Sequence, residues 1–222
     1  MARTLRALAW LLRYPDAGLR AAAAELGAAL RDEEALAAGR LAELDALVRR
    51  LASAPGLRLE AEYVELFDRG RRTALHLFEH VHGDSRDRGP AMVDLIKTYD
   101  RAGLQLVPDE LPDYLPVVLE FASTQPPAQA REFLRESAHI VRAIFSALLE
   151  RQSPYASVLA AVLDLAGERA QKVEIAAEPG IDDTWAEPEA FGGCTSQGQA
   201  RPHEAQPIHL VRPSRAPKRA AA

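Results

Sequence analysis

The chain has 222 residues, of which 48% are hydrophobic and 27% are charged, so it is long enough to bury the core of one domain. Its 32 acidic and 27 basic residues give a net charge of -5, which argues against a protein that binds nucleic acid or anionic lipid by charge alone. Aromatic residues make up only 6%, alanine and leucine are abundant, and this composition favours helices over strands.

The N-terminus and the single cysteine bear on the cellular compartment. An apolar run begins at Ala7, but Arg13 and Pro15 end it too early for a secretory signal. No window approaches the roughly 20 apolar residues that a membrane span needs. Cys194 alone can form neither an internal disulfide nor a cysteine metal cage. We therefore expect a soluble, cytoplasmic protein.

Helical patterns follow one another along most of the chain, and no strand pattern interrupts them. Apolar spacing, capping residues and prolines predict where each helix begins and ends. The expected helices cover residues 4–13, 17–30, 32–38, 40–52, 57–69, 73–81, 90–102, 111–122, 128–151 and 154–169. Asp16 is a suitable N-cap for the second of them, and Gly103 is a suitable residue just after the seventh. The sequence predicts an all-α fold, a compact multi-helix single domain over residues 1–172.

The composition changes after about Val173. Acidic residues come first, and proline and glycine then become frequent, so residues 173–222 can bury little apolar surface. Trp185 and Phe191 are the apolar exceptions, and they could fix this segment to the body of the protein or to a partner. We expect a flexible, largely disordered C-terminal tail.

The stretch from Tyr63 to Pro90 differs from the plain helices around it. It combines aromatic residues, three histidines and dense alternating charges, and it includes the loop G-D-S-R-D-R-G at residues 83–89. Such a loop could border an apolar groove for an amphipathic, basic peptide, although a solvated turn is the usual role of a charge run. Five side chains could line the groove, although core packing is the commoner role of such a stripe: Tyr63, Phe67, Leu77, Phe78 and Tyr99.

The histidines also suggest a metal site. His76 and His80 lie one turn apart on the expected helix at residues 73–81, but zinc takes three or four ligands and no clear further ligand is present. The sequence holds no catalytic serine motif, zinc protease motif or phosphate-binding loop. We expect neither a bound metal nor catalysis. A metal-binding helical protein and a general helical adaptor stay open as alternatives.

Three motifs resemble a known family. They are L-L-R-Y-P-D at residues 11–16, Y-V-E-L-F-D-R-G-R-R-T-A-L-H-L-F-E-H-V-H-G-D-S-R-D-R-G-P-A-M-V-D-L at residues 63–95, and L-Q-L-V-P-D-E-L-P-D-Y-L-P-V-V-L-E-F-A-S at residues 104–123. Together they are similar to the nitrate reductase molybdenum cofactor assembly chaperones. These are the delta subunits of the respiratory nitrate reductase system, within the redox-enzyme maturation chaperones.

The resemblance implies an all-helical chaperone that is not an enzyme and retains no cofactor. The family's client is the apo catalytic subunit of respiratory nitrate reductase, which carries the molybdenum cofactor and is held at its N-terminal segment before membrane assembly. A related molybdoenzyme is the alternative client. From the resemblance and the charge pattern together, we expect eight residues to contact the client peptide: Tyr63, Phe67, His80, Asp84, Arg86, Asp87, Asp109 and Glu110.

Overall fold

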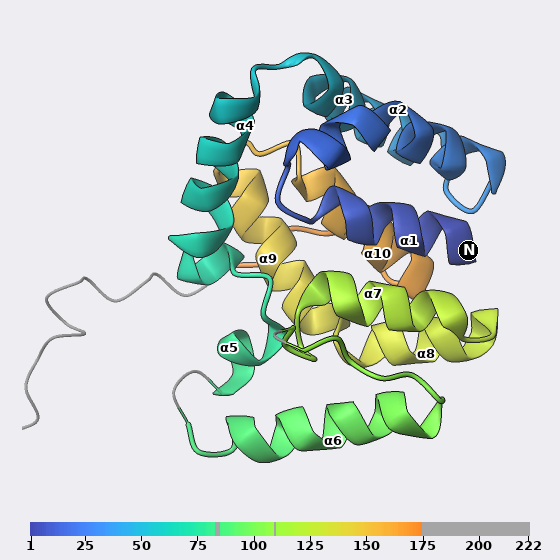
Figure 1. The fold of residues 1–222 in the computed structure, drawn as a ribbon, viewed down its shortest axis with the longest axis vertical. Coiled ribbons are helices and arrows are strands. Elements are labelled where there is room, and N and C mark those ends of the chain that lie inside the picture. Colours follow the sequence, from blue (N-terminus) through green and yellow to red (C-terminus); the bar gives the residue numbers. More distant parts are fainter. Residues whose placement is uncertain (83–84, 109, 175–222) are drawn as a thin grey trace, which may run out of the picture. The chain divides into compact units, whose positions relative to one another are not determined.

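A computed structural model describes residues 1–82, 85–108 and 110–174, and these residues confirm the predicted all-α fold (Figure 1). They contain no strand, and their α-helices are α1 (Ala2–Leu11), α2 (Ala17–Asp32), α3 (Ala38–Ser53), α4 (Gly56–Tyr63), α5 (Leu77–His82), α6 (Arg88–Arg101), α7 (Leu115–Thr124), α8 (Pro127–Glu136), α9 (Ala138–Glu150) and α10 (Ala156–Ala166).

Helix α10 forms the centre of the core because its sequence is apolar on every side. Every residue of α10 except Asp164 is buried. The helix contacts α1, α3, α8 and α9, which therefore bury their apolar faces against it (Figure 1). Gly167 ends α10 in a left-handed conformation, with φ 79°, that a residue without a side chain adopts readily.

Helix α1 packs between α2 and α7 and is held at its first turn by Glu33. The carboxylate of Glu33 accepts a hydrogen bond of 2.6 Å from the Thr4 hydroxyl and lies 2.6 Å from the amino group of Met1. Burial alone would raise the pKa of Glu33, but the hydrogen bonds from Met1 and Thr4 outweigh it and lower the pKa to about 2. Helix α1 ends at Leu11, and the residues that follow it line the site described below.

Several predicted helix boundaries are confirmed. The Leu19 N–H donates to the Asp16 carboxylate over 2.8 Å, so Asp16 caps α2 as expected. Gly103 follows α6 with φ 76°, the left-handed conformation predicted for the residue after that helix.

The prediction of a short helix at residues 32–38 is wrong. Helix α2 continues to Asp32, and Glu34 then takes a left-handed conformation with φ 51° that ends the helix. The neighbouring Glu33 is meanwhile bonded to α1. Contacts with a distant helix therefore decide the conformation here, over the helical preference of the local sequence.

The prediction of a single long helix at residues 128–151 is also wrong, because the chain forms two helices, α8 and α9, with a break at Ser137. The Ser137 hydroxyl donates to the Leu134 carbonyl over 3.2 Å, one of the local bonds by which serine competes with helical pairing. The break lets α8 and α9 each pack against α10.

The helix expected at residues 73–81 begins later, at Leu77, and the helix expected at residues 111–122 begins at Leu115. The residues directly before these helices, His76 and Tyr114, pair with each other in an isolated antiparallel bridge. His76 therefore does not lie on a helix with His80.

The described residues belong to one compact unit, Met1–Glu178. None of the helices in the described ranges is long and apolar enough to cross a membrane. The predicted tail beyond residue 174 lies outside the described residues, and the predicted domain boundary at residue 172 stays a prediction.

Candidate functional site

The segment Pro112–Leu115, which we call the strap, fastens α5 and α6 to the start of α7. The Tyr99 hydroxyl of α6 donates to the Pro112 carbonyl over 2.7 Å. The Leu77 N–H donates to the Asp113 carbonyl and the Phe78 N–H to the Asp113 carboxylate, each over 3.0 Å. Asp113 thus caps α5 from a distant position in the chain, and the strap is held in place on both sides.

Tyr114 of the strap is positioned by Tyr63 at the end of α4. The Tyr63 hydroxyl donates to the Leu12 carbonyl over 2.8 Å and lies 3.3 Å from the Tyr114 hydroxyl. Since the single Tyr63 hydroxyl hydrogen is used on Leu12, the Tyr114 hydroxyl is the donor of the second bond. Burial raises the pKa of both phenols, so both are neutral at physiological pH.

A π-helical turn, Val64–Asp68, follows α4 and directs two side chains toward Tyr114. Its wide geometry is set by the hydrogen bond of 3.1 Å from the Arg69 N–H to the Val64 carbonyl. Phe67 packs on Tyr63 with 4.7 Å between ring centroids, and it lies beside Asp68 in the same pocket. Turns of this kind are frequent at functional sites.

The first of two pockets, which we call the aromatic pocket, lies between the end of α1, the π-helical turn and the strap. It has a volume of about 530 Å³. It is lined by Arg13, Tyr14, Tyr63, Phe67, Asp68, Leu75, His76, Glu110, Leu111 and Tyr114. His76 stacks on Tyr114 with ring centroids 5.1 Å apart, so these two rings form one continuous wall.

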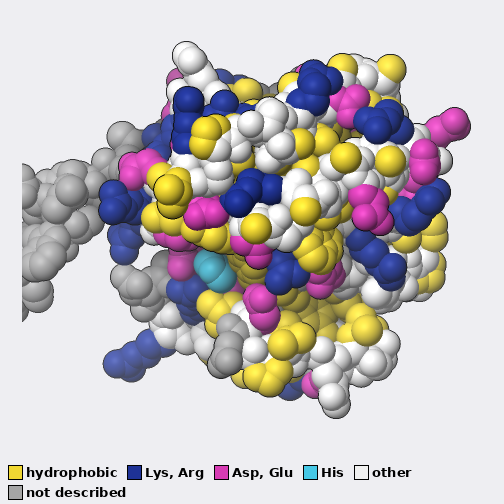
Figure 2. Space-filling view, turned by 45° about the horizontal axis from the view of Figure 1, so that its top comes forward, with side chains coloured by type: hydrophobic (Ala, Val, Ile, Leu, Met, Phe, Trp, Pro, Cys, Tyr) yellow, Lys and Arg dark blue, Asp and Glu magenta, His cyan; other side chains and the backbone are white. Residues whose placement is uncertain are grey.

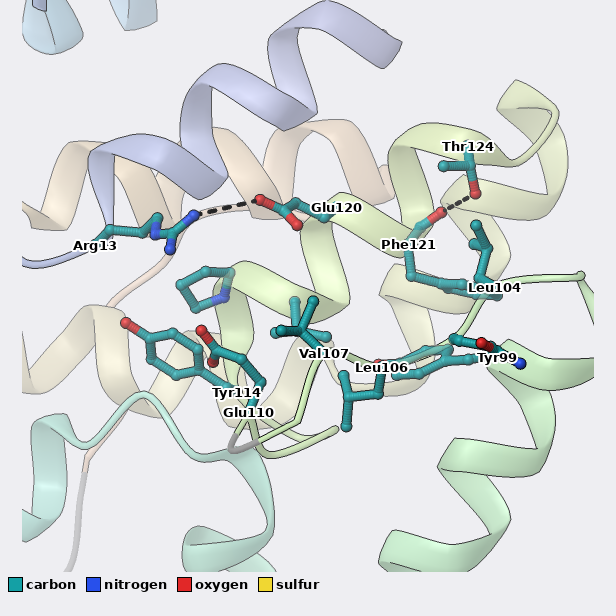
Figure 3. A pocket seen from close by; sticks show the side chains of 13 residues that line it. Arg13, Tyr99, Leu104, Leu106, Val107, Glu110, Tyr114, Glu120, Phe121 and Thr124 are labelled. Atoms are coloured by element: carbon teal, nitrogen blue, oxygen red, sulfur yellow. Dashed lines mark hydrogen bonds and ion pairs between the residues drawn. The ribbon is translucent and has the colours of Figure 1, made fainter. Parts of the chain in front are cut away.

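The second pocket, which we call the aliphatic pocket, lies between α7 and the segment that joins α6 to the strap (Figure 3). It has a volume of about 320 Å³. It is lined by Arg13, Tyr99, Leu104, Gln105, Leu106, Val107, Glu110, Tyr114, Pro116, Val117, Glu120, Phe121 and Thr124.

Arg13, Glu110 and Tyr114 line both pockets, so the two pockets adjoin, and we call them together the groove. Hydrophobic side chains lie within a hollow on this side of the molecule, and charged side chains lie at its margin (Figure 2). Three carboxylates, Asp68, Glu110 and Glu120, line the groove, whereas Arg13 is the single arginine among the described lining residues. The groove therefore offers apolar surface together with an excess of negative charge.

The structure brings Tyr63, Phe67 and Glu110 together in the aromatic pocket. Tyr63 and Phe67 are largely buried there, at 5% and 6% exposure, so each also forms part of the core. Tyr99, expected as a lining residue, lies in the aliphatic pocket, whereas Leu77 and Phe78 line neither pocket.

His80, Arg86 and Asp87 also line neither pocket. The His80 Nε2 lies 2.9 Å from the Ala74 carbonyl oxygen, which fixes the imidazole within its own segment. Arg86 and Asp87 are exposed at the start of α6, where Asp87 bonds to Ser85. The expected contacts Asp84 and Asp109 lie outside the described residues.

Metal-ligand geometry is missing from the part of the chain that the structure describes, since no group of three or more histidine, cysteine or acidic side chains gathers there. The His76 Nδ1 is 3.6 Å from the Asp113 carboxylate, and His80 bonds to the backbone. Neither histidine has the further ligands that zinc requires.

Most of the lining residues are not among the expected contacts, and these include Arg13, Tyr14, Tyr114 and Glu120. All four lie within the two shorter motifs by which the sequence resembles the chaperone family. The signal that pointed to these residues was therefore their place in the family motifs, which form surface of the groove as well as ends of helices.

The fold and site define an all-helical protein whose described residues form an apolar groove with acidic groups, and no metal centre. The family model of the nitrate reductase delta subunit matches residues 14–161, and the chain belongs to this family. The matched range contains every described residue of the groove except Arg13.

Individual relatives agree with the family. The chain is 40% identical over 194 residues to the nitrate reductase molybdenum cofactor assembly chaperone NarJ of Escherichia coli K12, covering 86% of this chain and 81% of NarJ. It is 42% identical over 163 residues to the assembly chaperone NarW of the same strain, covering 73% and 68%. These proteins are named as assembly chaperones, which supports the expectation that this protein is not an enzyme.

The fold also matches a solved structure. A redox enzyme maturation protein from Archaeoglobus fulgidus superimposes with a TM-score of 0.53 over 76% of this chain and 94% of that one. The two sequences are 21% identical, so the match concerns the fold alone.

Proposed function

We propose that this protein is a chaperone for the catalytic subunit of respiratory nitrate reductase, and that it binds the N-terminal segment of that subunit before the molybdenum cofactor is inserted. The family and the names of the relatives support the client. The observation that carries the binding mode is the groove in which the aromatic and aliphatic pockets adjoin at Arg13, Glu110 and Tyr114.

The chemistry of the groove fits an amphipathic segment with basic residues. Apolar side chains of such a segment would enter the two pockets, and its basic side chains would meet Asp68, Glu110 and Glu120. Charge complementarity of this kind gives specificity and speeds association. A chaperone must also bind the immature client better than the finished one, and a terminal segment that docks elsewhere after assembly provides that difference.

The test is capture of the apo catalytic subunit by the full-length chaperone, with and without the client's N-terminal segment. We expect capture to be lost without the segment. Val107, which lines the aliphatic pocket and is 67% exposed, offers a variant, Val107→Asp, that should weaken capture without unfolding the protein. Leu57→Asp is the matched control, because Leu57 is 83% exposed and lines neither pocket.

Equal capture of the truncated client would place the main contact outside the groove. Equal capture of the catalytic subunit of another molybdoenzyme would favour the alternative client. If Val107→Asp and Leu57→Asp behave alike, the aliphatic pocket has no part in binding.

A further inference from the structure

Arg13 occupies a central position in the groove, because it follows α1 and lines both pockets. Its guanidinium Nη1 lies 3.9 Å from a carboxylate oxygen of Glu120 on α7, as the dashed line in Figure 3 marks. On its other side the guanidinium carbon lies 5.2 Å from the centre of the Trp10 ring. The arginine thus has two partners, the acidic Glu120 in the groove and the aromatic Trp10, which lines neither pocket.

We propose that Arg13 is an internal competitor for the client, occupying in the free chaperone the acidic position that a basic side chain of the client takes in the complex. The inference rests on the proposed function and adds the residue that sets the charge selectivity of the groove. An incoming arginine or lysine would pair with Glu120, and Arg13 would leave the carboxylate while it keeps its contact with Trp10.

The contact between Arg13 and Glu120 is weak enough to be exchanged. Both side chains are about half exposed, at 44% and 49%, and the distance between them is long for an ion pair, at 3.9 Å. Exposed ion pairs of this kind contribute little, since water and salt screen them. Arg13 already lies over the ring of Trp10, which is 40% exposed, so a guanidinium that leaves Glu120 keeps its aromatic partner.

The charges around Arg13 favour the exchange. Glu110 shares both pockets with Arg13, and Asp68 lies in the aromatic pocket, so the groove holds an excess of carboxylates even while Arg13 is present. A client side chain that binds Glu120 adds a positive charge to this acidic surface. The same charge would be repelled by an Arg13 that could not move, which is why this residue controls how strongly basic segments bind.

The experiment measures, by titration calorimetry, the binding of a synthetic client N-terminal peptide to full-length wild-type protein and to Arg13→Gln. A second peptide has its arginines and lysines replaced by glutamine. We expect Arg13→Gln to bind the basic peptide about two- to fivefold more tightly, the range set by the loss of one exposed ion pair. Binding of the neutral peptide should not change.

Two further variants complete the test. In a Glu120→Gln background, Arg13→Gln should no longer strengthen binding of the basic peptide, because the contested carboxylate is gone. Arg31→Gln is the control for net charge, since Arg31 pairs with Asp45 over 2.6 Å and lines neither pocket. It should leave both affinities unchanged.

Equal or weaker binding of the basic peptide to Arg13→Gln, with normal binding to the wild type, would overturn the competitor role alone. A gain shared by both peptides would also overturn it, because the effect would not depend on client charge. Failure of both the wild type and Arg13→Gln to bind the basic peptide would overturn the proposed function together with this inference.

Discussion

At the scale of single residues, Asp113 lines neither pocket but holds in place the strap that carries Tyr114. It is fully buried, and its carboxylate accepts the Phe78 N–H while its carbonyl accepts the Leu77 N–H. One residue therefore orients α5 and fixes the strap that carries Tyr114. Its second carboxylate oxygen has no hydrogen-bond partner among the described residues and lies 3.6 Å from His76 Nδ1. A buried carboxylate is unfavourable unless bonded, so the bond to α5 must offset its desolvation.

We expect Asp113→Ala to lower the free energy of unfolding by about 1–2 kcal/mol, because the partly buried Phe78 N–H loses its acceptor. Asp113→Asn keeps an acceptor oxygen and should cost less. Urea denaturation measures both. Asp87→Ala is the control: Asp87 precedes α6 but makes no side-chain bond to that helix, so its loss should stay within about 0.5 kcal/mol. Equal losses for Asp113→Ala and Asp113→Asn would mean that the charge, and not the hydrogen bond, stabilises the strap.

At the scale of elements, the π-helical turn Val64–Asp68 depends on close backbone packing at Gly70. The Thr73 hydroxyl donates to the Leu66 carbonyl across this position. A Cβ at Gly70 would lie 2.7 Å from the Leu66 carbonyl oxygen and would also meet the Thr73 hydroxyl. The turn that presents Phe67 and Asp68 to the groove therefore requires glycine here.

Gly70→Ala should destabilise the protein by about 1–3 kcal/mol, because the backbone must move to admit the methyl group. Gly89→Ala is a matched substitution on α6, where a Cβ would meet nothing within 4 Å. It should be neutral or stabilising by up to about 1 kcal/mol, since alanine favours helix over glycine. Thermal or urea denaturation compares the two, and an equally mild Gly70→Ala would show that the turn can relax.

The start and end of a helix could be predicted from the sequence where nearby residues decide them. They could not be predicted where contacts with distant residues decide them. Periodic leucines and the Asp16 cap predicted α1 and α2 because those signals lie within each helix. The late start of α5 depends on Asp113, whose carboxylate accepts a hydrogen bond from the Phe78 N–H. The two residues are 35 positions apart in the sequence. No local pattern contains such information, and the same is true of the break at Ser137, where α8 and α9 each meet α10.

The groove was predictable to a similar extent. Tyr63 and Phe67 stood out because aromatic residues one turn apart mark an apolar face. Arg13 and Glu120 did not, because they meet only when α1 packs on α7. The alternating charges of residues 83–89 drew attention to Arg86 and Asp87, whose side chains are exposed and lie outside both pockets.

At the scale of the whole molecule, charge and groove act together. The chain carries a net charge of -5. Within that total, the described groove residues include three carboxylates and one arginine. A basic segment is therefore attracted before it makes contact and is held partly by charge afterwards.

We expect the affinity for a basic client peptide to fall by about three- to tenfold when NaCl rises from about 50 to about 500 mM, because salt screens partly exposed charges. Calorimetry or fluorescence anisotropy measures the change. A peptide with its basic residues replaced by glutamine should show a much smaller response. If the basic peptide instead binds more tightly at high salt, apolar contacts dominate and the carboxylates contribute little.

The Tyr63 hydroxyl bonds to Leu12 and to Tyr114, each 51 residues away along the chain in opposite directions. The binding surface is consequently assembled from parts that are made at widely separated times during synthesis. A nascent chain that has not yet produced α7 lacks Glu120 and Phe121 and so lacks one side of the groove. Such long-range contacts form late in folding. If the groove binds the client as proposed, a nascent chain that ends before α7 could not yet hold a client, so binding would have to follow the synthesis of both sides of the groove.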